Sequence, residues 1–170
     1  WIVRACYEFD RLEGLCFSAL NFLILERTGS PRNPLRLGQS DDLYAHEKGL
    51  ITKQEVRAVG LSLLGIEPHH RVWDLGAGCG SVAVEASYLA REGSVYAVER
   101  NPSRLQLIRE NIRRTGAYTV EVVECEMPDG LDSLPDPDRV FIGGGLGHGT
   151  EVLSRALNRL KPGGRMVLHV

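Results

Sequence analysis

A glycine-rich turn follows an acidic residue in the stretch RVWDLGAGCGSVAVE, which occupies positions 71–85. A turn of this kind between a strand and a helix lets backbone N–H groups approach a nucleotide-like ligand, because glycine has no Cβ to block it. Asp74 stands two positions before the first glycine. The candidate ligand-binding residues of this stretch are Asp74, Gly76, Ala77, Gly78, Cys79 and Gly80.

The spacing of these glycines separates two classes of ligand. A dinucleotide site has the pattern Gly-x-Gly-x-x-Gly, whereas this turn reads Gly-x-Gly-x-Gly and places Ser81 where the third dinucleotide glycine would fall. A carboxylate at Asp74 would repel a diphosphate and attract a cation. S-adenosylmethionine carries an ammonium and a sulfonium group and no phosphate, so the turn predicts a methyl-donor site. A turn cap is the alternative role for Asp74.

Further candidate ligand-binding residues follow the next two apolar runs of the sequence. Glu99 ends the run SVYAVE, where a carboxylate can accept hydrogen bonds from both hydroxyls of a ribose. NAD sites share this feature, and a solvated strand end is the alternative. Glu126 is expected to receive the adenine amino group, with Met127 packed on the ring. Methionine more often fills gaps in a core, which is the alternative for Met127.

A second glycine run, Gly143, Gly144 and Gly145, follows an apolar segment that ends at Ile142. Three residues without side chains leave room for a flat, bulky methyl acceptor, or let the backbone offer N–H groups to anionic groups. A flexible turn is the alternative. His148 lies just beyond and titrates near neutral pH, so it is the candidate catalytic acid or base, with a solvated loop histidine as the alternative.

The elements that must position these residues alternate along the chain. The sequence Thr52-Lys53-Gln54-Glu55 is a capping box, which predicts the start of a helix. Its expected apolar stripe consists of Val56, Val59, Leu63, Leu64 and Ile66. The further pattern predicts strands at 71–75, 94–99, 119–124, 139–142 and after 164, and helices at 81–91, 102–114 and 150–160. Asn101 and Pro102 are the expected cap and first residue of the second of these helices.

This alternation predicts an α/β domain with a doubly wound parallel sheet covered by helices on both faces. The strands are nearly continuous apolar runs, as buried parallel strands should be. Ligands of such sheets lie at the carboxyl ends of the strands, near the point where the strand order reverses. The glycine turn and the acidic strand ends are therefore expected to meet there.

Composition narrows the classes of function. The chain has 170 residues, 43% hydrophobic and 25% charged, with a formal net charge of -2. No basic tract favours a nucleic-acid partner, and no apolar run approaches the ~18 residues of a membrane span. Four cysteines without a C-x-x-C pair favour reduced thiols in the cytoplasm over disulfides or a metal site.

Residues 1–37 differ from the rest. They contain one strand candidate at 21–26 and the linker-like stretch TGSPRNPLRLG. One strand cannot form a domain, so we expect this segment to be the tail of a preceding domain plus a linker. Residues 38–170 are expected to form the α/β domain, and the chain to be a fragment of a longer protein.

Five runs together resemble the decarboxylating precorrin-6B methyltransferases of cobalamin biosynthesis. They are HEKGLITKQEVRAV, VWDLGAGCGSVAVEA, VYAVERNP, ECEMPDGL and FIGGG, and the resemblance covers about residues 38 to 170. It implies a class I S-adenosylmethionine-dependent methyltransferase, lacking its last two strands in this chain. The implied reaction methylates carbon 15 of a corrin precursor and removes the acetate carboxyl group on ring C. The cofactor contacts it implies are Thr52, Gly76 through Gly80, Glu99 and Met127.

The resemblance also implies partners. FSALNFLILER looks like the end of the carbon-5 methyltransferase domain that precedes this one in the fused precorrin-6Y C5,15-methyltransferases. The family suggests a homo-oligomer, with a tetramer as the expected form. Because the substrate bears many carboxylates, Lys53, Arg57 and Arg100 are candidate contacts to it, with a solvated surface charge as the alternative for each. Thr52 has the competing role of helix cap.

Two positions depart from the family, and other functions stay open. Cys125 stands where the family usually has Gly, and Met127 where it usually has Ala, which would narrow the adenine pocket. The alternatives are a class I methyltransferase with another acceptor and a truncated, non-catalytic module that binds the cofactor. A dinucleotide-dependent oxidoreductase is disfavoured by Asp74 and Ser81.

Overall fold

The computed structural model describes residues 34–47, 49–143 and 149–169. The chain divides into two units, residues 1–30 and 31–170, and every described residue belongs to the second. The expected strand at 21–26, the glycines at 144 and 145 and His148 therefore lie outside the described residues. The expected domain boundary after residue 37 stays a prediction.

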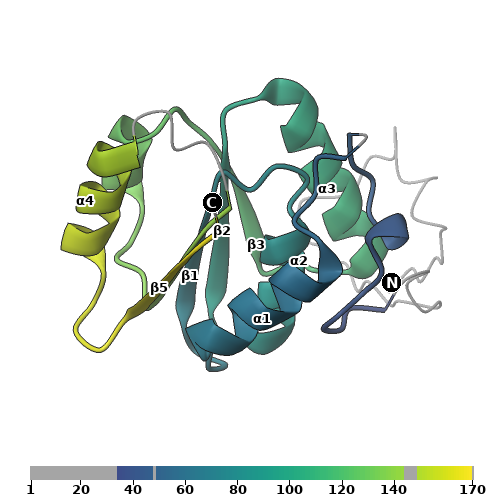
Figure 1. The fold of residues 1–170 in the computed structure, drawn as a ribbon, viewed down its shortest axis with the longest axis horizontal. Helices are drawn as coiled ribbons and strands as arrows, with labels where there is room; N and C mark the ends of the chain where they lie inside the picture. The colour runs from purple at the N-terminus through teal and green to yellow at the C-terminus, as the bar shows by residue number, and fades with distance from the viewer. Residues whose placement is uncertain (1–33, 48, 144–148, 170) are drawn as a thin grey trace, which may run out of the picture. The chain divides into compact units, whose positions relative to one another are not determined.

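Five parallel strands form one sheet in the order β3-β2-β1-β4-β5 (Figure 1). The strands are β1 Arg71–Leu75, β2 Ser94–Glu99, β3 Val120–Glu124, β4 Arg139–Ile142 and β5 Arg165–Leu168. The order runs outward from β1 to β3 and then reverses to β4 on the other side. The reversal places a ligand-binding position at the carboxyl ends of β1 and β4, and the predicted parallel α/β fold is confirmed.

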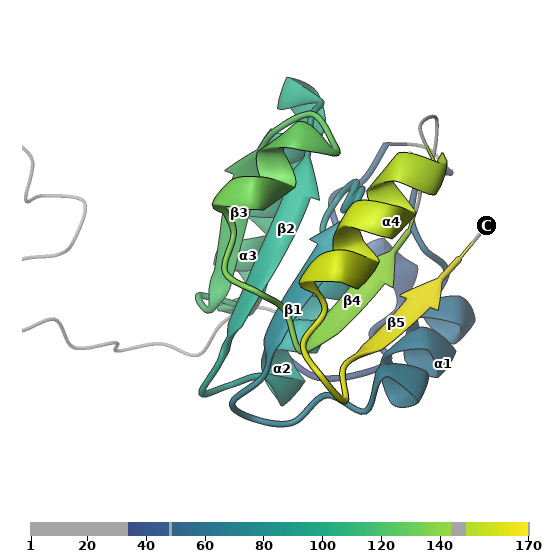
Figure 2. The same cartoon turned by 90° about the vertical axis from the view of Figure 1, so that its left-hand side faces the viewer.

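Helices cover both faces of this sheet (Figure 2). The helices are α1 Gln54–Leu64, α2 Ser81–Leu89, α3 Pro102–Thr115 and α4 Gly149–Arg159, with 3-10 turns η2 Asp41–Leu43 and η3 Asp129–Ser133. The first three helices lie on one face, and α4 and η3 lie on the other. In the described part of the chain, no helix is both long enough and apolar enough to cross a membrane.

Strand alternation divides the core into two clusters. Successive side chains of β1 point to opposite faces, so Val72 joins the cluster under α1, α2 and α3, while Trp73 and Leu75 join the cluster under α4 and η3. Both clusters are buried from water. The sheet is therefore covered on both faces, which is why its strands are apolar throughout.

Most predicted boundaries match the structure. The strands at 71–75, 94–99 and 139–142 are confirmed, and the strand expected at 119–124 begins at Val120. Asn101 caps α3, with its Oδ1 accepting a hydrogen bond from the Ser103 N–H at 2.9 Å. The helix ends where Gly116 takes a left-handed conformation with φ 77°, which glycine adopts without strain.

The predictions for α1 were partly wrong. Its N-cap is Lys53 without a side-chain cap, so Thr52 lies before the helix and does not form the expected capping box. Val59 and Leu63 of the expected apolar stripe are exposed, at 59% and 60%. The buried face contains the expected Leu64 together with Arg57, Gly60 and Leu61, which were not predicted to face the core. A buried ion pair and a close contact at the glycine, described below, set this orientation.

Replacing Gly60 with Ala is expected to destabilise the protein. A Cβ at this position would lie 2.7 Å from Cε2 of Phe141, a fully buried ring that has little room to move. Overpacking of this kind costs about 1–3 kcal/mol, although alanine is the better helix former by up to ~1 kcal/mol. Urea unfolding measures the difference, and a variant as stable as the parent would show that the contact is not tight.

Candidate functional site

The glycine turn has the backbone geometry that its sequence predicts. Gly76, Gly78 and Gly80 have φ values of 73°, 58° and 79°, which other residues adopt only with strain. The N–H groups of Gly76 and Ala77 both donate to the Val98 carbonyl, at 3.0 and 2.9 Å. The turn is thereby tied to the end of β2, beside the reversal of strand order.

Two of these glycines serve different purposes. A Cβ on Gly80 would lie 3.0 Å from Cγ2 of Ile108 in α3, so this glycine lets α2 and α3 pack closely. A Cβ on Gly78 would meet no atom within 4 Å, because this part of the turn faces open space. The middle of the turn is therefore the part that is accessible to a ligand.

Glu99 lies against the glycine turn. Its Oε2 accepts a hydrogen bond from the Gly78 N–H at 2.9 Å, and its Oε1 accepts from the N–H groups of Arg100 and Asn101 at 2.9 and 3.0 Å. The residue is 6% exposed, so the alternative of a solvated strand end is wrong. The structure brings Glu99 and the turn together, as expected from the two strand ends.

Asp74 has a different role from the one its charge suggested. It is 1% exposed, and its Oδ2 accepts a hydrogen bond from the Ala83 N–H in the first turn of α2 at 2.9 Å. This contact supports the alternative role of a cap that fixes the start of the helix. Burial raises the pKa of Asp74 from 3.8 to about 7, opposed by the Ala83 N–H and assisted by the charge of Glu99. The expectation of a fixed negative charge that selects a cationic ligand is therefore weakened.

The buried carboxyl of Asp74 predicts a pH dependence of stability. Because its pKa is higher in the folded than in the unfolded protein, the folded state binds the extra proton between about pH 4 and pH 7. Its contribution to stability therefore falls as the pH rises through that range and is constant above it. Asp74→Asn keeps an oxygen for the Ala83 N–H. We expect this variant to gain stability relative to the parent as the pH rises, measured as the difference in urea midpoints; a pH-independent difference would contradict the assignment.

Thr52 and Gly143 lie together at the end of β4. A Cβ on Gly143 would be 3.7 Å from Oγ1 of Thr52 and 3.2 Å from Cε1 of Phe141. The Gly143 N–H donates to the Leu75 carbonyl at 3.1 Å, directly before the glycine turn. Thr52, Gly143 and the turn thus border the same reversal of strand order.

The remaining expected site residues point elsewhere. The side chain of Glu126 is 69% exposed and forms an ion pair with Nη1 of Arg100 at 2.7 Å, while the half-buried Met127 packs against the core cluster under α4. Their expected contacts to adenine stay predictions. Arg57 is fully buried and paired with Glu85, so its expected contact with a substrate carboxylate is wrong.

One residue at the site was not predicted from the sequence. Asn111 of α3 is fully buried, and its Nδ2 donates to the Cys79 carbonyl in the glycine turn at 2.9 Å. It shares the buried face of α3 with Leu105 and Ile108. The sequence signal for Asn111 is a single amide that continues the three-residue spacing of this otherwise apolar stripe.

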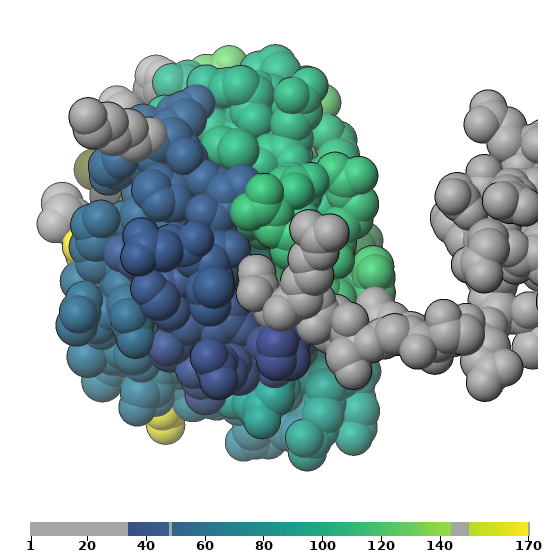
Figure 3. Space-filling view, turned by 90° about the vertical axis from the view of Figure 1, so that its right-hand side faces the viewer, coloured from purple at the N-terminus to yellow at the C-terminus, as the bar shows by residue number. Residues whose placement is uncertain are grey.

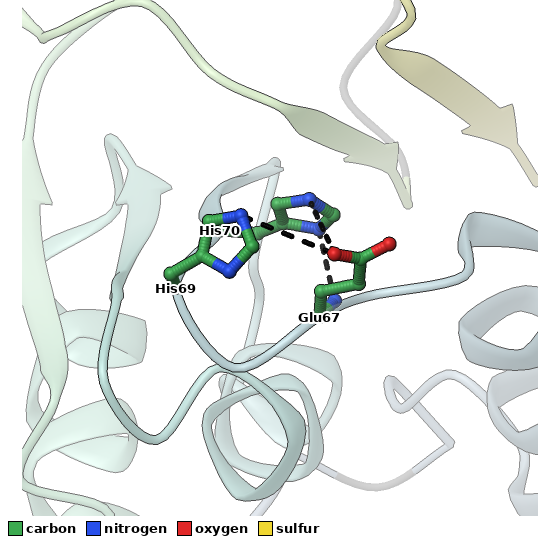
Figure 4. A group of neighbouring side chains, drawn as sticks. All are labelled: Glu67, His69 and His70. Carbon is green, nitrogen blue, oxygen red and sulfur yellow. Dashed lines mark hydrogen bonds and ion pairs between the residues drawn. The ribbon is translucent and has the colours of Figure 1, made fainter.

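A group of three side chains with metal-ligand chemistry lies before β1. The ligand atoms of Glu67, His69 and His70 are within 4.8 Å of one another (Figure 4). Nδ1 of His70 accepts a hydrogen bond from the Glu67 N–H at 2.9 Å, so the neutral ring carries its hydrogen on Nε2, the nitrogen that faces the Glu67 carboxylate at 3.8 Å. A protonated nitrogen cannot ligate a metal. The contacts therefore give His70 a structural role in this turn.

Comparison with known protein families identifies the family of this chain. The family model described as a precorrin methyltransferase domain matches residues 42–170. The chain belongs to this family. The resemblance read from the five sequence runs is thereby confirmed.

Two relatives show how much of a precorrin methyltransferase the chain represents. It is 40% identical over 134 residues to a decarboxylating precorrin-6Y C(5,15)-methyltransferase of Sinorhizobium sp., covering 79% of this chain and 32% of that protein. It is 36% identical over 129 residues to a decarboxylating cobalt-precorrin-6B C(15)-methyltransferase of Salmonella typhimurium, covering 75% of this chain and 66% of that protein. The chain spans about a third of the first relative and just under two thirds of the second.

Solved structures confirm the methyltransferase fold. A precorrin-6y C5,15-methyltransferase of Geobacter metallireducens is 50% identical with a TM-score of 0.75, covering 78% of this chain and 69% of that chain. An S-adenosylmethionine-dependent O-methyltransferase of Thermotoga maritima is 20% identical with a TM-score of 0.63, covering 69% of this chain and 44% of that chain, and shares the fold alone. The precorrin methyltransferase domain thus has the expected class I fold.

Proposed function

We propose that this chain is the methyltransferase domain of an enzyme that methylates carbon 15 of a precorrin and removes the carboxyl group of its ring C acetate, with S-adenosylmethionine as methyl donor. The observation that carries the proposal is the contact between Gly78 and Glu99 at the reversal of strand order, in a chain of the precorrin methyltransferase family. Relatives named for this reaction support the choice of acceptor.

The described residues fit the proposed donor. The turn at Gly78 faces open space, which leaves room for S-adenosylmethionine to approach the backbone of this turn. Glu99 would accept a hydrogen bond from one ribose hydroxyl, since a carboxylate has about four lone-pair positions and three backbone N–H groups already occupy three of them. Thr52 and Gly143 would border the pocket from the end of β4.

The protein's part in the reaction is positioning. Bound S-adenosylmethionine supplies an electrophilic methyl group on sulfur. The acceptor carbon provides the electron pair of the new C–C bond, the S–CH₃ bond breaks, and its electrons stay on sulfur. Carbon dioxide leaves the acetate, and the macrocycle takes up the remaining electron pair with a proton. Holding the acceptor carbon in line with the sulfonium would supply most of the rate.

The proposed function extends to the domain organisation and assembly of the whole protein. We propose that residues 1–37 are the tail of a preceding carbon-5 methyltransferase domain plus a linker, and that residues 38–170 form the carbon-15 domain. The match to about a third of the Sinorhizobium protein supports a fused partner domain. The family resemblance supports a homo-oligomer, and a tetramer is the form that we expect.

An assay of the product tests the proposed reaction. The purified chain is incubated with S-adenosylmethionine and a precorrin that already carries its carbon-5 methyl group, and the product is analysed by mass spectrometry. We expect the gain of one methyl group and the loss of carbon dioxide, dependent on the donor. Methylation with the carboxyl group retained, or an unchanged precorrin in the presence of bound donor, would contradict the proposed reaction.

A further inference from the structure

A segment ahead of α1 crosses three helices of the domain. It comprises residues 38–47 and 49–53, called the strap below, and contacts side chains of α1, α2 and α3. Figure 3 shows it in dark blue on the surface, with α1 on one side and α3 on the other. The strap includes Thr52, the residue beside Gly143 at the candidate site.

A buried ion pair holds both ends of the strap. Nε of Arg57 donates to Oε1 of Glu85 at 2.7 Å, and both side chains are 0% exposed. The same guanidinium donates from Nη2 to the Gln39 carbonyl at 2.6 Å and from Nη1 to the Thr52 carbonyl at 2.5 Å. Glu85 in turn accepts from the Gly38 N–H at 2.8 Å. One pair therefore fixes the beginning and the end of the strap to α1 and α2.

Asn111 holds the middle of the strap. Its Oδ1 accepts a hydrogen bond from the Ala45 N–H at 2.8 Å, and its Nδ2 donates to the Ala45 carbonyl at 2.9 Å. The same Nδ2 donates to the Cys79 carbonyl of the glycine turn at 2.9 Å. Since Asn111 is fully buried, water cannot replace these contacts. One amide thus fixes the strap and the glycine turn relative to each other.

We propose that Asn111 is a positioning residue for the cofactor. It sets the glycine turn against the strap, so that the wall bearing Thr52 and the wall bearing Gly78 are in place before the ligand binds. The identity of the ligand rests on the proposed function. A pre-formed pocket binds more tightly because less ordering is required on binding, so loss of the amide weakens binding and leaves the chemical step intact.

Replacing Asn111 with Leu tests the proposal with the whole chain. The side chain keeps its approximate volume, while the Ala45 and Cys79 backbone groups lose their partner. We expect S-adenosylhomocysteine to bind at least tenfold more weakly by calorimetry, with the KM for S-adenosylmethionine raised and kcat nearly unchanged. Asn158→Leu, on the exposed side of α4, is the control and should bind like the parent. Parent-like affinity of the Asn111 variant would overturn the proposal.

Hydrogen exchange gives a second test that needs no ligand. In Asn111→Leu we expect faster exchange at both the Ala45 amide and the Gly80 amide, which donates to Ala77 within the turn, while the amides of β1 and β2 keep their protection. Faster exchange at Ala45 alone would show that Asn111 does not couple the two walls. If Asn111→Leu does not fold, hydrogen exchange is measured on the parent protein with and without S-adenosylhomocysteine. The ligand should then slow exchange at the Ala45 and Gly80 amides together. Slower exchange at Gly80 alone would overturn the coupling. If the parent binds no S-adenosylhomocysteine, the proposed function fails, and the ligand-free exchange still decides the coupling.

Discussion

Replacing Arg57 with Met will lower the free energy of unfolding by about 3–5 kcal/mol, the usual cost of leaving one member of a buried ion pair alone. Glu85 would keep the hydrogen bonds from Tyr44, Gly38 and Gln39 but would lose its only cationic contact among the described residues. The Gln39 and Thr52 carbonyls would also lose their donors. Urea unfolding followed by circular dichroism measures the loss.

Two further variants separate charge from packing. Arg57→Met with Glu85→Gln should recover part of the loss, because the uncompensated buried charge is gone. Arg113→Met breaks a pair with Glu110 at 2.6 Å on the surface of α3, where water screens the charges. The surface variant should shift the urea midpoint far less than Arg57→Met. Equal shifts for the two arginines would show that burial does not govern the Arg57 pair.

Replacing Glu99 with Gln is expected to weaken the binding of S-adenosylhomocysteine by a factor on the order of 10 to 100, since hydrogen bonds to a charged group are worth about 1.5–3 kcal/mol. The amide offers one acceptor oxygen where the carboxylate offers two. Its NH₂ group would also face an N–H donor, either that of Gly78 or those of Arg100 and Asn101. Calorimetric titration measures the affinity of the variant and of the parent.

Glu121→Gln is the matched control for this experiment. It makes the same change from a carboxylate to an amide at an exposed position of β3, which pairs with Tyr96 of β2. We expect it to bind S-adenosylhomocysteine as the parent does. Thermal unfolding of Glu99→Gln establishes that the protein is folded at the titration temperature. Unchanged affinity in a folded Glu99 variant would mean that the carboxylate does not contact the ligand.

The sequence predicted the sheet well because local signals determine its parts. Near-continuous apolar runs marked β1, β2 and β4, and the pair Asn101–Pro102 marked the start of α3. The glycine turn and Glu99 were expected to meet because parallel strands end at the same edge of a sheet, and their hydrogen bond confirms it.

The parts that were missed depend on partners far away in the chain. Arg57 is buried because Glu85, 28 positions later, neutralises it, and no helical periodicity contains that information. Asn111 reaches Ala45, 66 positions earlier. For Asp74 the residue type suggested a ligand contact, whereas its burial and its bond to Ala83 support the alternative role of a cap that holds α2.

Calorimetric titration of the parent chain with S-adenosylhomocysteine and, separately, with NAD tests the central claim most directly. The open turn at Gly78, beside the carboxylate of Glu99, should bind S-adenosylhomocysteine at a single site and show no heat of binding with NAD. Clear binding of NAD together with no binding of S-adenosylhomocysteine would contradict the assignment of this turn to a methyl donor.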